Sequence, residues 1–318
     1  MKIMNKINKF FSLKKFNKKP IFERLFYILL GILLFVVLLN NARNNLGIKE
    51  GFEQTGEFIV KKKPEEIYDD FYVDLYDDLV YNKPKNNCEL NIIKKFTNLD
   101  KKSSVLDIGS GTGHHVNMFS KIARSAVGID IAPSMVNISK SNYPNNEYIN
   151  DNALNSMAVQ HQSFTHITCL YFTIYYFEDK RAFFKNCYDW LLPGGHLILH
   201  LVDRDNFDPI IPAGDPFNFV SPQKYSKERI TSTIIKFKDY SYKSNFELKS
   251  NESIAILEEE FKNLKNGDVR KNEHKSYMPT QKEILSKTKE VGFIMSEYEE
   301  LASCGYFAQY IYVLQKPN

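Results

Sequence analysis

The chain has 318 residues, of which 43% are hydrophobic and 25% are charged, and its formal net charge is +4 at pH 7. This length accommodates one large α/β domain and an appendage. Residues 1–24 carry seven lysines and one arginine against the single acid Glu23, which leaves a net charge of −3 for the rest of the chain. The larger part is therefore mildly acidic, which excludes the broad basic surface of a nucleic-acid-binding protein.

A charge-free apolar segment follows the basic N-terminus. Leu25–Leu39 contains fifteen residues, and its extension to Ala42 brings it to the lower limit of about 17 residues for a spanning helix. The absence of a polar face argues against a buried core helix. We therefore expect a basic segment over residues 1–24, a transmembrane anchor over 25–42 and a linker over 43–62. The prediction is a single-pass membrane protein, with the membrane and the side left open, and with a signal peptide or a mitochondrial presequence as the alternatives.

Residues 63–318 are expected to form the folded domain. Near its start, Tyr68, Tyr72 and Tyr76 recur at intervals of four residues, with acidic residues on the other face. This spacing predicts an amphipathic helix whose aromatic stripe packs inward.

A glycine-rich segment is the most informative feature of the domain. Val105–Ile108 has the composition of a buried strand, and it leads directly into a turn with glycine at positions 109, 111 and 113. Such a turn lets the backbone approach a ligand, and the helix expected over Val116–Ile122 would point its free N–H groups at the same place. A dinucleotide fingerprint needs glycine at the first, third and sixth positions, and His114 occupies the sixth.

A second apolar strand, Ala126–Ile131, places Asp130 at its end. An acid at this position in a nucleotide-binding α/β unit accepts hydrogen bonds from ribose hydroxyls. The third strand is expected to end near Asp151-Asn152-Ala153, and which of Asp151 and Asn152 would face a ligand stays open.

The rest of the domain alternates between strand and helix patterns. Between residues 204 and 279, several segments alternate apolar and polar residues with a period of two, which predicts an antiparallel β insert. The expected segments are a strand over 163–172, a helix over 182–192 that Pro193 ends, a strand over 196–201, insert strands over 231–238, 240–248, 253–261 and 269–277, a helix over 280–292, and strands over 293–299 and 307–314.

The order of these motifs resembles the class I S-adenosylmethionine (SAM) dependent methyltransferases, in particular the small-molecule enzymes with a type 11/25-like methyltransferase domain. The resemblance rests on Val105–His115, on Ala126–Val136 and on the segment NCYDWLLPGGHLIL at 186–199. It implies a Rossmann-like seven-stranded α/β sheet with an antiparallel insert, and a tyrosine-rich N-terminal helix that closes over the cofactor. The cofactor-binding residues that it implies are Asp107, Gly109, Ser110, Gly111, Thr112, Gly113, Asp130, Ile131, Asp151, Asn152, Ala153 and Leu170.

The implied reaction is in-line transfer of a methyl group from the sulfonium to an acceptor, expected to be a small molecule or a lipid. Alignment of donor and acceptor supplies most of the catalysis, and a general base is needed only if the acceptor keeps its proton at neutral pH. The candidates near the expected pocket are Tyr175, Tyr176, His200 and Asp203. The insert also resembles lids that form dimers in small-molecule methyltransferases, which leaves a homodimer open.

Other functions fit the sequence less well. Asn152 stands where the family carries an acid, so a membrane-tethered module that binds SAM without turnover is the alternative to an enzyme. The glycine spacing argues against a nicotinamide-dependent oxidoreductase. The four cysteines show no paired or metal-ligand spacing, and we expect neither a disulfide nor a metal site.

Overall fold

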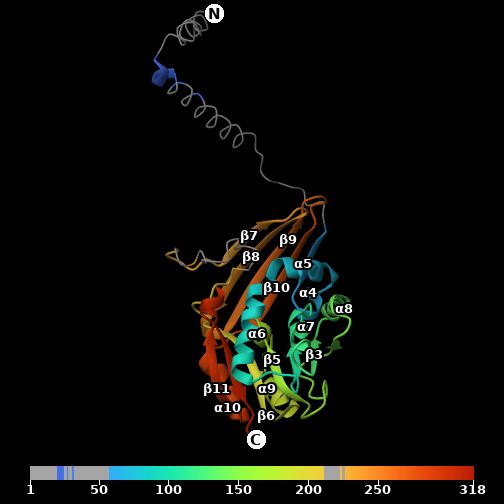
Figure 1. Cartoon of the computed structure of the whole chain (residues 1–318). Helices are drawn as coiled ribbons and strands as arrows, with labels where there is room; N and C mark the ends of the chain where they lie inside the picture. The colour runs from blue at the N-terminus through green and yellow to red at the C-terminus, as the bar shows by residue number, and fades with distance from the viewer. Residues whose placement is uncertain (1–19, 25–26, 28–30, 32–56, 211–222, 224–225) are drawn as a thin grey trace, which may run out of the picture. The chain divides into compact units, whose positions relative to one another are not determined.

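The computed structural model describes residues 20–24, 27, 31, 57–210, 223 and 226–318. The chain divides into two compact units, Met1–Thr55 and Gly56–Asn318. Residues 21–24 of the first unit are helical. The second unit contains two β-sheets and is the part of the chain that carries the motifs identified above (Figure 1).

A seven-stranded sheet forms the centre of the second unit, in the strand order β11-β12-β6-β5-β2-β3-β4. The five strands β6, β5, β2, β3 and β4 run parallel to one another. At the β6 edge, β12 pairs with β6 and β11 pairs with β12, both antiparallel. This arrangement fits the predicted Rossmann-like fold. The strands are β2 (Ser104–Ile108), β3 (Ser125–Asp130), β4 (Glu147–Asn150), β5 (Phe164–Cys169), β6 (Leu191–Val202), β11 (Ile294–Glu300) and β12 (Gln309–Gln315).

Helices cover both faces of this sheet because its central strands are apolar on both sides. In β6, Leu197 and Leu199 belong to one hydrophobic core, whereas Ile198 between them belongs to the other. The first core packs against α9 (Lys180–Trp190) and α10 (Gln281–Val291), and the second packs against α6 (Lys83–Thr97), α7 (His114–Ser120) and α8 (Pro133–Asn142). Helix α9 ends at Trp190, and β6 begins at Leu191, before the expected Pro193 boundary.

A second, five-stranded sheet has the order β1-β10-β9-β8-β7. Four of its strands come from the insert and are antiparallel, as the alternating pattern predicts. The fifth, β1, lies within the range 43–62 that was expected to be a linker, and it pairs in parallel with β10. The strands are β1 (Phe58–Lys61), β7 (Ser232–Lys236), β8 (Tyr240–Lys249), β9 (Ile254–Asn263) and β10 (Val269–Tyr277).

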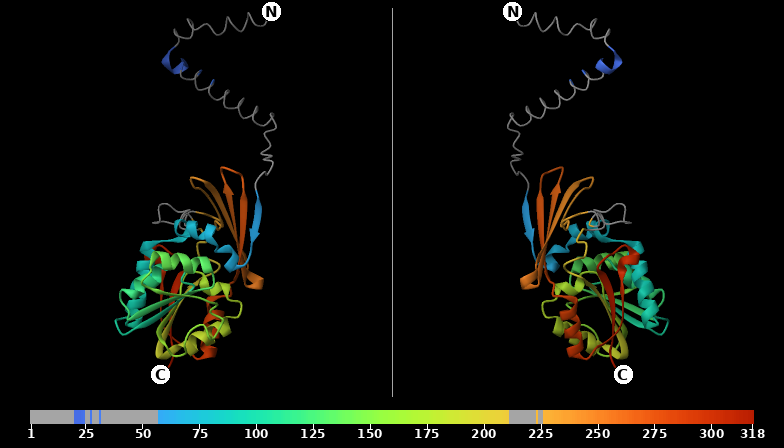
Figure 2. Two further views of the ribbon diagram at one scale, coloured as in Figure 1. Left: turned by 90° about the vertical axis from the view of Figure 1, so that its right-hand side faces the viewer. Right: turned by 90° about the vertical axis from the view of Figure 1, so that its left-hand side faces the viewer.

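Helices α4 (Pro64–Ile67) and α5 (Asp70–Val80) connect the two sheets. On one side Tyr72 packs with Tyr242 and Phe261 of the five-stranded sheet. On the other side Val73 packs with Met135 of α8, which belongs to the seven-stranded layer. The side views show these helices between the orange sheet and the green helices of the Rossmann-like layer (Figure 2).

The expected transmembrane helix requires a correction. Among the residues that the structure describes, no helix combines the length and the apolar character needed to cross a membrane. Most of the range 25–42 lies outside the described residues. The transmembrane part of the predicted fold, and with it the predicted single-pass membrane localisation, is therefore not upheld.

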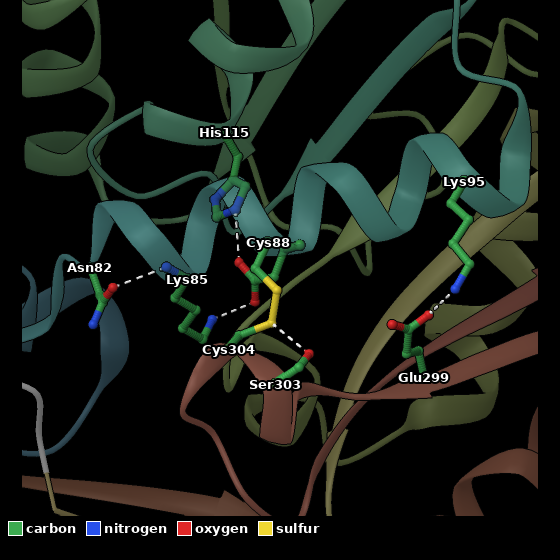
Figure 3. The surroundings of a disulfide bond; sticks show 9 residues. Asn82, Lys85, Cys88, Lys95, His115, Glu299, Ser303 and Cys304 are labelled. Carbon is green, nitrogen blue, oxygen red and sulfur yellow. Dashed lines mark hydrogen bonds and ion pairs between the residues drawn. A yellow bond between two sulfur atoms is a disulfide. The ribbon is translucent and has the colours of Figure 1, made fainter. Parts of the chain in front are cut away.

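The expectation that the cysteines are unpaired is also wrong. Cys88 of α6 and Cys304 of the 3₁₀ turn η5 (Leu301–Cys304) form a disulfide with a Cα–Cα distance of 6.1 Å (Figure 3). Next to it, the fully buried Glu89 accepts hydrogen bonds from Lys85 Nζ and, at 3.0 Å, from His115 Nε2. Burial alone would raise the pKa of Glu89, but the charges of Lys85 and His115 hold it well below its usual range.

The disulfide gives a direct prediction. The denatured chain should expose two thiols, Cys169 and Cys187, before reduction and four after it, because only Cys88 and Cys304 are paired. Replacing the pair by serine should lower the free energy of unfolding by about 2–4 kcal/mol, since the bond closes a long loop in the unfolded chain. Thiol titration in denaturant and urea unfolding measure the two effects. Four reactive thiols in the unreduced chain would contradict the pairing.

Candidate active site

A cavity of about 1410 Å³ opens between the glycine-rich turn, helices α5 and α6, and the insert sheet. The carboxyl ends of β2 and β5 point toward it, which is where open α/β sheets bind their ligands. Its walls combine tyrosines with acids and one buried histidine. The lining includes Tyr68, Tyr72, Tyr76, Asp77, Asp107, Gly109, Ser110, Gly111, Thr112, His114, Leu170, Thr173, Tyr176, Glu259 and His274.

The glycine-rich turn is shaped by its contacts with β3 and with the 3₁₀ turn η1 (Thr173–Tyr176). The Gly109 N–H donates to the Ile129 carbonyl at 2.8 Å, which ties the turn to the next strand. Gly109 has a φ of +69°, and a Cβ there would lie 2.4 Å from the Thr173 side chain. Any other residue at position 109 would therefore push η1 away from the turn.

Asp130 fixes the next part of the turn. Its carboxylate accepts hydrogen bonds from the Gly111 N–H and the Ala132 N–H, both at 2.9 Å. Burial raises the pKa of Asp130, while these backbone donors oppose the rise. At Gly111 a Cβ would be 3.8 Å from the Tyr76 ring, so the glycine leaves room between the turn and α5.

Asp77 of helix α5 holds this helix against the glycine-rich turn. Asp77 accepts hydrogen bonds from the Thr112 hydroxyl at 2.8 Å and pairs with His114 Nε2 at 2.8 Å. The sequence predicted the tyrosine stripe of this helix, and the structure places Tyr76 beside Gly111. The contacts of Asp77 explain how the stripe is positioned against the turn.

Asp107 contributes a buried carboxyl group to the cavity. It is 3% exposed and accepts a hydrogen bond from the Thr168 hydroxyl at 2.6 Å. Burial raises its pKa to about 6. A cation bound in the cavity would compensate this burial and favour the ionised form.

The structure brings only part of the predicted cofactor set to the cavity. Asp107, Gly109, Ser110, Gly111, Thr112 and Leu170 line it. Gly113, Asp130, Ile131, Asp151, Asn152 and Ala153 are absent from its lining within the described residues. Asp151 and Asn152 accept hydrogen bonds from the backbone of their own loop, from Asn152 N–H and Leu154 N–H respectively. Asp130 contacts the turn by accepting the Gly111 N–H.

Of the four predicted catalytic residues, Tyr176 reaches the cavity. Tyr175 is fully buried, and its hydroxyl accepts a hydrogen bond from the Val202 N–H at 2.8 Å. His200 is also fully buried, and burial lowers its pKa to about 3, so it is neutral. Asp203 accepts hydrogen bonds from the Asp205 N–H and the Asn206 side chain, which makes it a turn residue. Tyr175, His200 and Asp203 are thus absent from the cavity lining within the described residues, and the catalytic parts predicted for the four residues stay predictions.

A polar cluster that the sequence reasoning missed lies on the insert wall of the cavity. Glu259 is 3% exposed, and its two carboxylate oxygens accept four hydrogen bonds. The donors are the Tyr72 hydroxyl at 2.9 Å, the Tyr242 hydroxyl at 2.8 Å, the Asn272 amide at 3.1 Å and His274 Nε2 at 2.7 Å. Burial alone would raise the pKa of Glu259, but His274 and the other donors lower it, so the carboxylate is ionised.

The cluster continues from the insert to the Rossmann-like layer. His274 Nδ1 is 2.7 Å from the Tyr176 hydroxyl, and that hydroxyl is 2.9 Å from the hydroxyl of Tyr68. The period-two pattern of β9 contained a signal for it: Ala255 and Phe261 face inward, and Glu259 shares their face. An acid on a buried strand face needs partners, and these belong to β10, β8 and α5.

Three features together define the class I methyltransferase architecture. They are a parallel sheet with one reversed strand, β12, between β6 and the edge strand β11, a glycine-rich turn after β2 and an acid at the end of β3. The family described as "Methyltransferase domain" matches residues 106–199. A comparison with curated proteins found no significant match. The chain thus carries a methyltransferase domain of the SAM-dependent class, as the motifs predicted, with SAM as the cofactor of that class.

Solved structures of this class resemble the chain over most of its length. A SAM-dependent methyltransferase from Clostridium acetobutylicum has 14% identity and a TM-score of 0.58, with 78% of this chain and 97% of that one covered. CalS10, an amino pentose methyltransferase from Micromonospora echinaspora solved with SAM bound, has 16% identity and a TM-score of 0.55, with 78% and 98% covered. The sugar N-methyltransferase KedS8 from Streptoalloteichus has 14% identity and a TM-score of 0.55, with 74% and 88% covered. At these identities the likeness establishes the fold.

The raised pKa of Asp107 predicts a dependence of stability on pH. The folded chain binds this proton more tightly than the unfolded chain, in which the pKa is near 3.8, so Asp107 destabilises the fold as pH rises from about 4 to about 6. Asp107→Asn removes this titration. The stability of the variant relative to the wild type should therefore increase over that interval and level off above it. Urea unfolding of both proteins from pH 4.5 to 7.5 measures the difference, and a constant difference would contradict the burial of this charge.

Proposed function

We propose that the chain binds SAM between the glycine-rich turn and helix α5 and transfers its methyl group to a small molecule held in the same cavity. The observation that carries this proposal is the turn itself. Asp130 holds it through Gly111, the Tyr76 ring lies over Gly111, and the turn lines a cavity of about 1410 Å³.

The residues present fit the cofactor chemically. Asp107 offers a buried carboxylate to the ammonium group of the methionine part, and burial raises the pKa of this acid more than the nearby His115 lowers it. A Cβ at position 111 would lie 3.8 Å from the Tyr76 ring and would occupy part of the space between the turn and α5. Asp130 has lone pairs beyond the two that accept backbone N–H groups, and these can serve ribose hydroxyls.

The adenine of SAM is proposed to bind against the loop after β4. Ile131 and Leu154 are each 38% exposed and offer apolar surface to a base beside Asp151 and Asn152. The Asn152 side-chain oxygen accepts the Leu154 N–H, while Asp151 accepts the Asn152 N–H. Both retain further acceptor capacity, so the choice between them for the adenine amine stays open.

The acceptor is proposed to be a small polar molecule, and an amino sugar is the first class to test. Two of the structural neighbours carry names that describe methylation of an amino pentose and of a sugar nitrogen. The aromatic and acidic walls of the cavity suit a compact polar ring with a cationic group. A lipid acceptor was suggested by the expected membrane anchor, and that argument falls with the correction above.

Bound SAM supplies an electrophilic methyl group, and the protein's own residues hold, orient and enclose the partners. Tyr68, Tyr72 and Tyr76 would exclude water from one side, because the ring of Tyr68 packs edge-to-face on those of Tyr72 and Tyr76 and all three line the cavity. Alignment of this kind is worth up to about 7–11 kcal/mol of barrier in favourable cases. Of the four predicted catalytic residues, Tyr176 is the one that lines the cavity.

Calorimetric titration of SAM into the full chain tests this function. We expect micromolar binding that Asp130→Ala weakens at least tenfold, about 1.4 kcal/mol, because the turn loses the acceptor for Gly111. Asp189→Ala is the matched control: this acid pairs with Lys185 on the surface of α9 and should leave the affinity unchanged. A folded wild-type chain that does not bind SAM would contradict the proposal. Binding without transfer to any acceptor would favour the non-catalytic module.

A further inference from the structure

We propose that Tyr68, Tyr176, His274 and Glu259 form a proton relay that deprotonates the acceptor, and that the acceptor is an amine which enters the cavity as an ammonium ion. This inference rests on the proposed function of the same cavity and assigns a part to residues of the insert sheet. It is carried by the direction of the hydrogen bonds, by their position beside the glycine-rich turn, and by the charge of the cluster.

The direction of the chain follows from the buried carboxylate at its end. Glu259 is an acceptor only, so His274 must donate from Nε2. In the neutral imidazole Nδ1 is then an acceptor, and the Tyr176 hydroxyl donates to it across 2.7 Å. The Tyr176 oxygen in turn accepts the proton of Tyr68 across 2.9 Å. Every O–H in the relay therefore points away from the cavity and toward Glu259.

This arrangement leaves lone pairs of the tyrosine oxygens for a ligand. Tyr68 and Tyr176 are half-buried and line the cavity, whereas Glu259 and His274 are each 3% exposed behind them. An N–H group of the acceptor could donate to either hydroxyl. A proton taken there can move to His274 Nδ1, where the resulting imidazolium is stabilised by Glu259 in a setting of low dielectric.

The relay lies close to the expected position of the methyl donor. Thr173, at the start of the 3₁₀ turn that ends with Tyr176, contacts Gly109. From the other side, the rings of Tyr68 and Tyr76 have centroids 6.0 Å apart, and Tyr76 covers Gly111. The Tyr76 ring on one side and η1 on the other therefore connect the glycine-rich turn to the Tyr68 and Tyr176 hydroxyls.

The charge of the cluster selects an ammonium ion. The ionised Glu259 gives the cluster a net negative charge when His274 is neutral, and tyrosine faces attract cations. The one guanidinium on the same face of β10, Arg270, is already paired with Asp69 at 2.7 Å. The titratable side chains that contact His274 or Glu259 are Tyr68, which directly follows α4, Tyr72 of α5, Tyr176 of η1 and Tyr242 of β8.

The step balances as follows. The ammonium nitrogen gives a proton to the Tyr176 oxygen, directly or through Tyr68, while the original Tyr176 proton moves to His274 Nδ1. The nitrogen now has a free electron pair, the N–CH₃ bond forms as the S–CH₃ bond breaks, and the electron pair of that bond leaves with the sulfur. His274 finally returns its proton to solvent.

The first test reads the relay without turnover. In the full chain labelled with ¹⁵N-histidine, the His274 signals are identified by their loss in His274→Gln. The relay requires a neutral imidazole with the proton on Nε2 at the pH of the transfer assay, and it predicts a shift of the Nδ1 signal in Tyr176→Phe. The control Tyr298→Phe removes an exposed hydroxyl on β11 and should leave it unchanged. An imidazolium throughout pH 6–9 would overturn the proposal, because His274 could not accept a proton.

The second test separates the relay from cofactor binding. His274→Gln and Tyr176→Phe should bind SAM with an affinity within about twofold of the wild type by calorimetry. A loss of SAM binding in the wild type would count against the proposed function, and a loss of transfer with binding intact concerns the relay alone. With methylamine, benzylamine and glucosamine as probes, transfer should fall at least about 100-fold at pH 7. The deficit should shrink toward pH 9.5, because the free amine then forms in solution. A deficit that is independent of pH would show a merely structural role, and transfer to none of the amines would overturn the amine assignment.

Discussion

A single buried carboxylate determines how the two sheets of this domain meet. Glu259 is taken out of water on the inner face of β9, and four donors from α5, β8 and β10 satisfy its oxygens. Removing one donor would leave buried charge without compensation, which is far more costly than losing an exposed ion pair. The registers of β8, β9 and β10 and the position of α5 are therefore fixed together. Because His274 also contacts Tyr176, the same carboxylate fixes the insert against the Rossmann-like layer.

The site that results has two walls of different character. The Rossmann-like wall consists mainly of backbone, namely the glycine-rich turn, which Asp130 and the Ile129 carbonyl hold in place. The opposite wall is built from side chains on α5 and the insert, and it supplies aromatic rings, acids and an imidazole. Helix α5 links them, since Asp77 binds the turn and Tyr72 binds Glu259. Cofactor and acceptor chemistry are thus coupled through one eleven-residue helix.

The sequence predicted the parts of the fold whose signals are local. The strand before Gly109, the acid at position 130 and the insert strands were readable because apolar periodicity and glycine spacing depend on neighbours in the chain. The predicted strand 269–277 coincides with β10. His200 lies near the end of the central strand β6 and Asp203 directly follows it. Both faces of β6 are buried, so the period of the strand gives no sign of which face meets a ligand.

Other features depend on contacts between distant segments. Cys88 and Cys304 are separated by 216 residues, so their spacing could not reveal the disulfide. The Tyr176–His274 and Tyr72–Glu259 hydrogen bonds join segments that are 98 and 187 residues apart. The apolar run over 25–42 suggested a spanning helix from composition alone, and the described helices do not include one. Only the folded arrangement shows which polar residues on strand faces share a partner.

A crystal structure of the full chain with S-adenosylhomocysteine, the product left after methyl transfer, tests the central claim most directly. The account predicts the amino acid part beside Asp107, the ribose at Asp130, and the thioether sulfur turned toward the Tyr68 and Tyr176 hydroxyls across the open part of the cavity. A ligand bound elsewhere, or bound in the turn with its sulfur turned away from this hydroxyl pair, would contradict it.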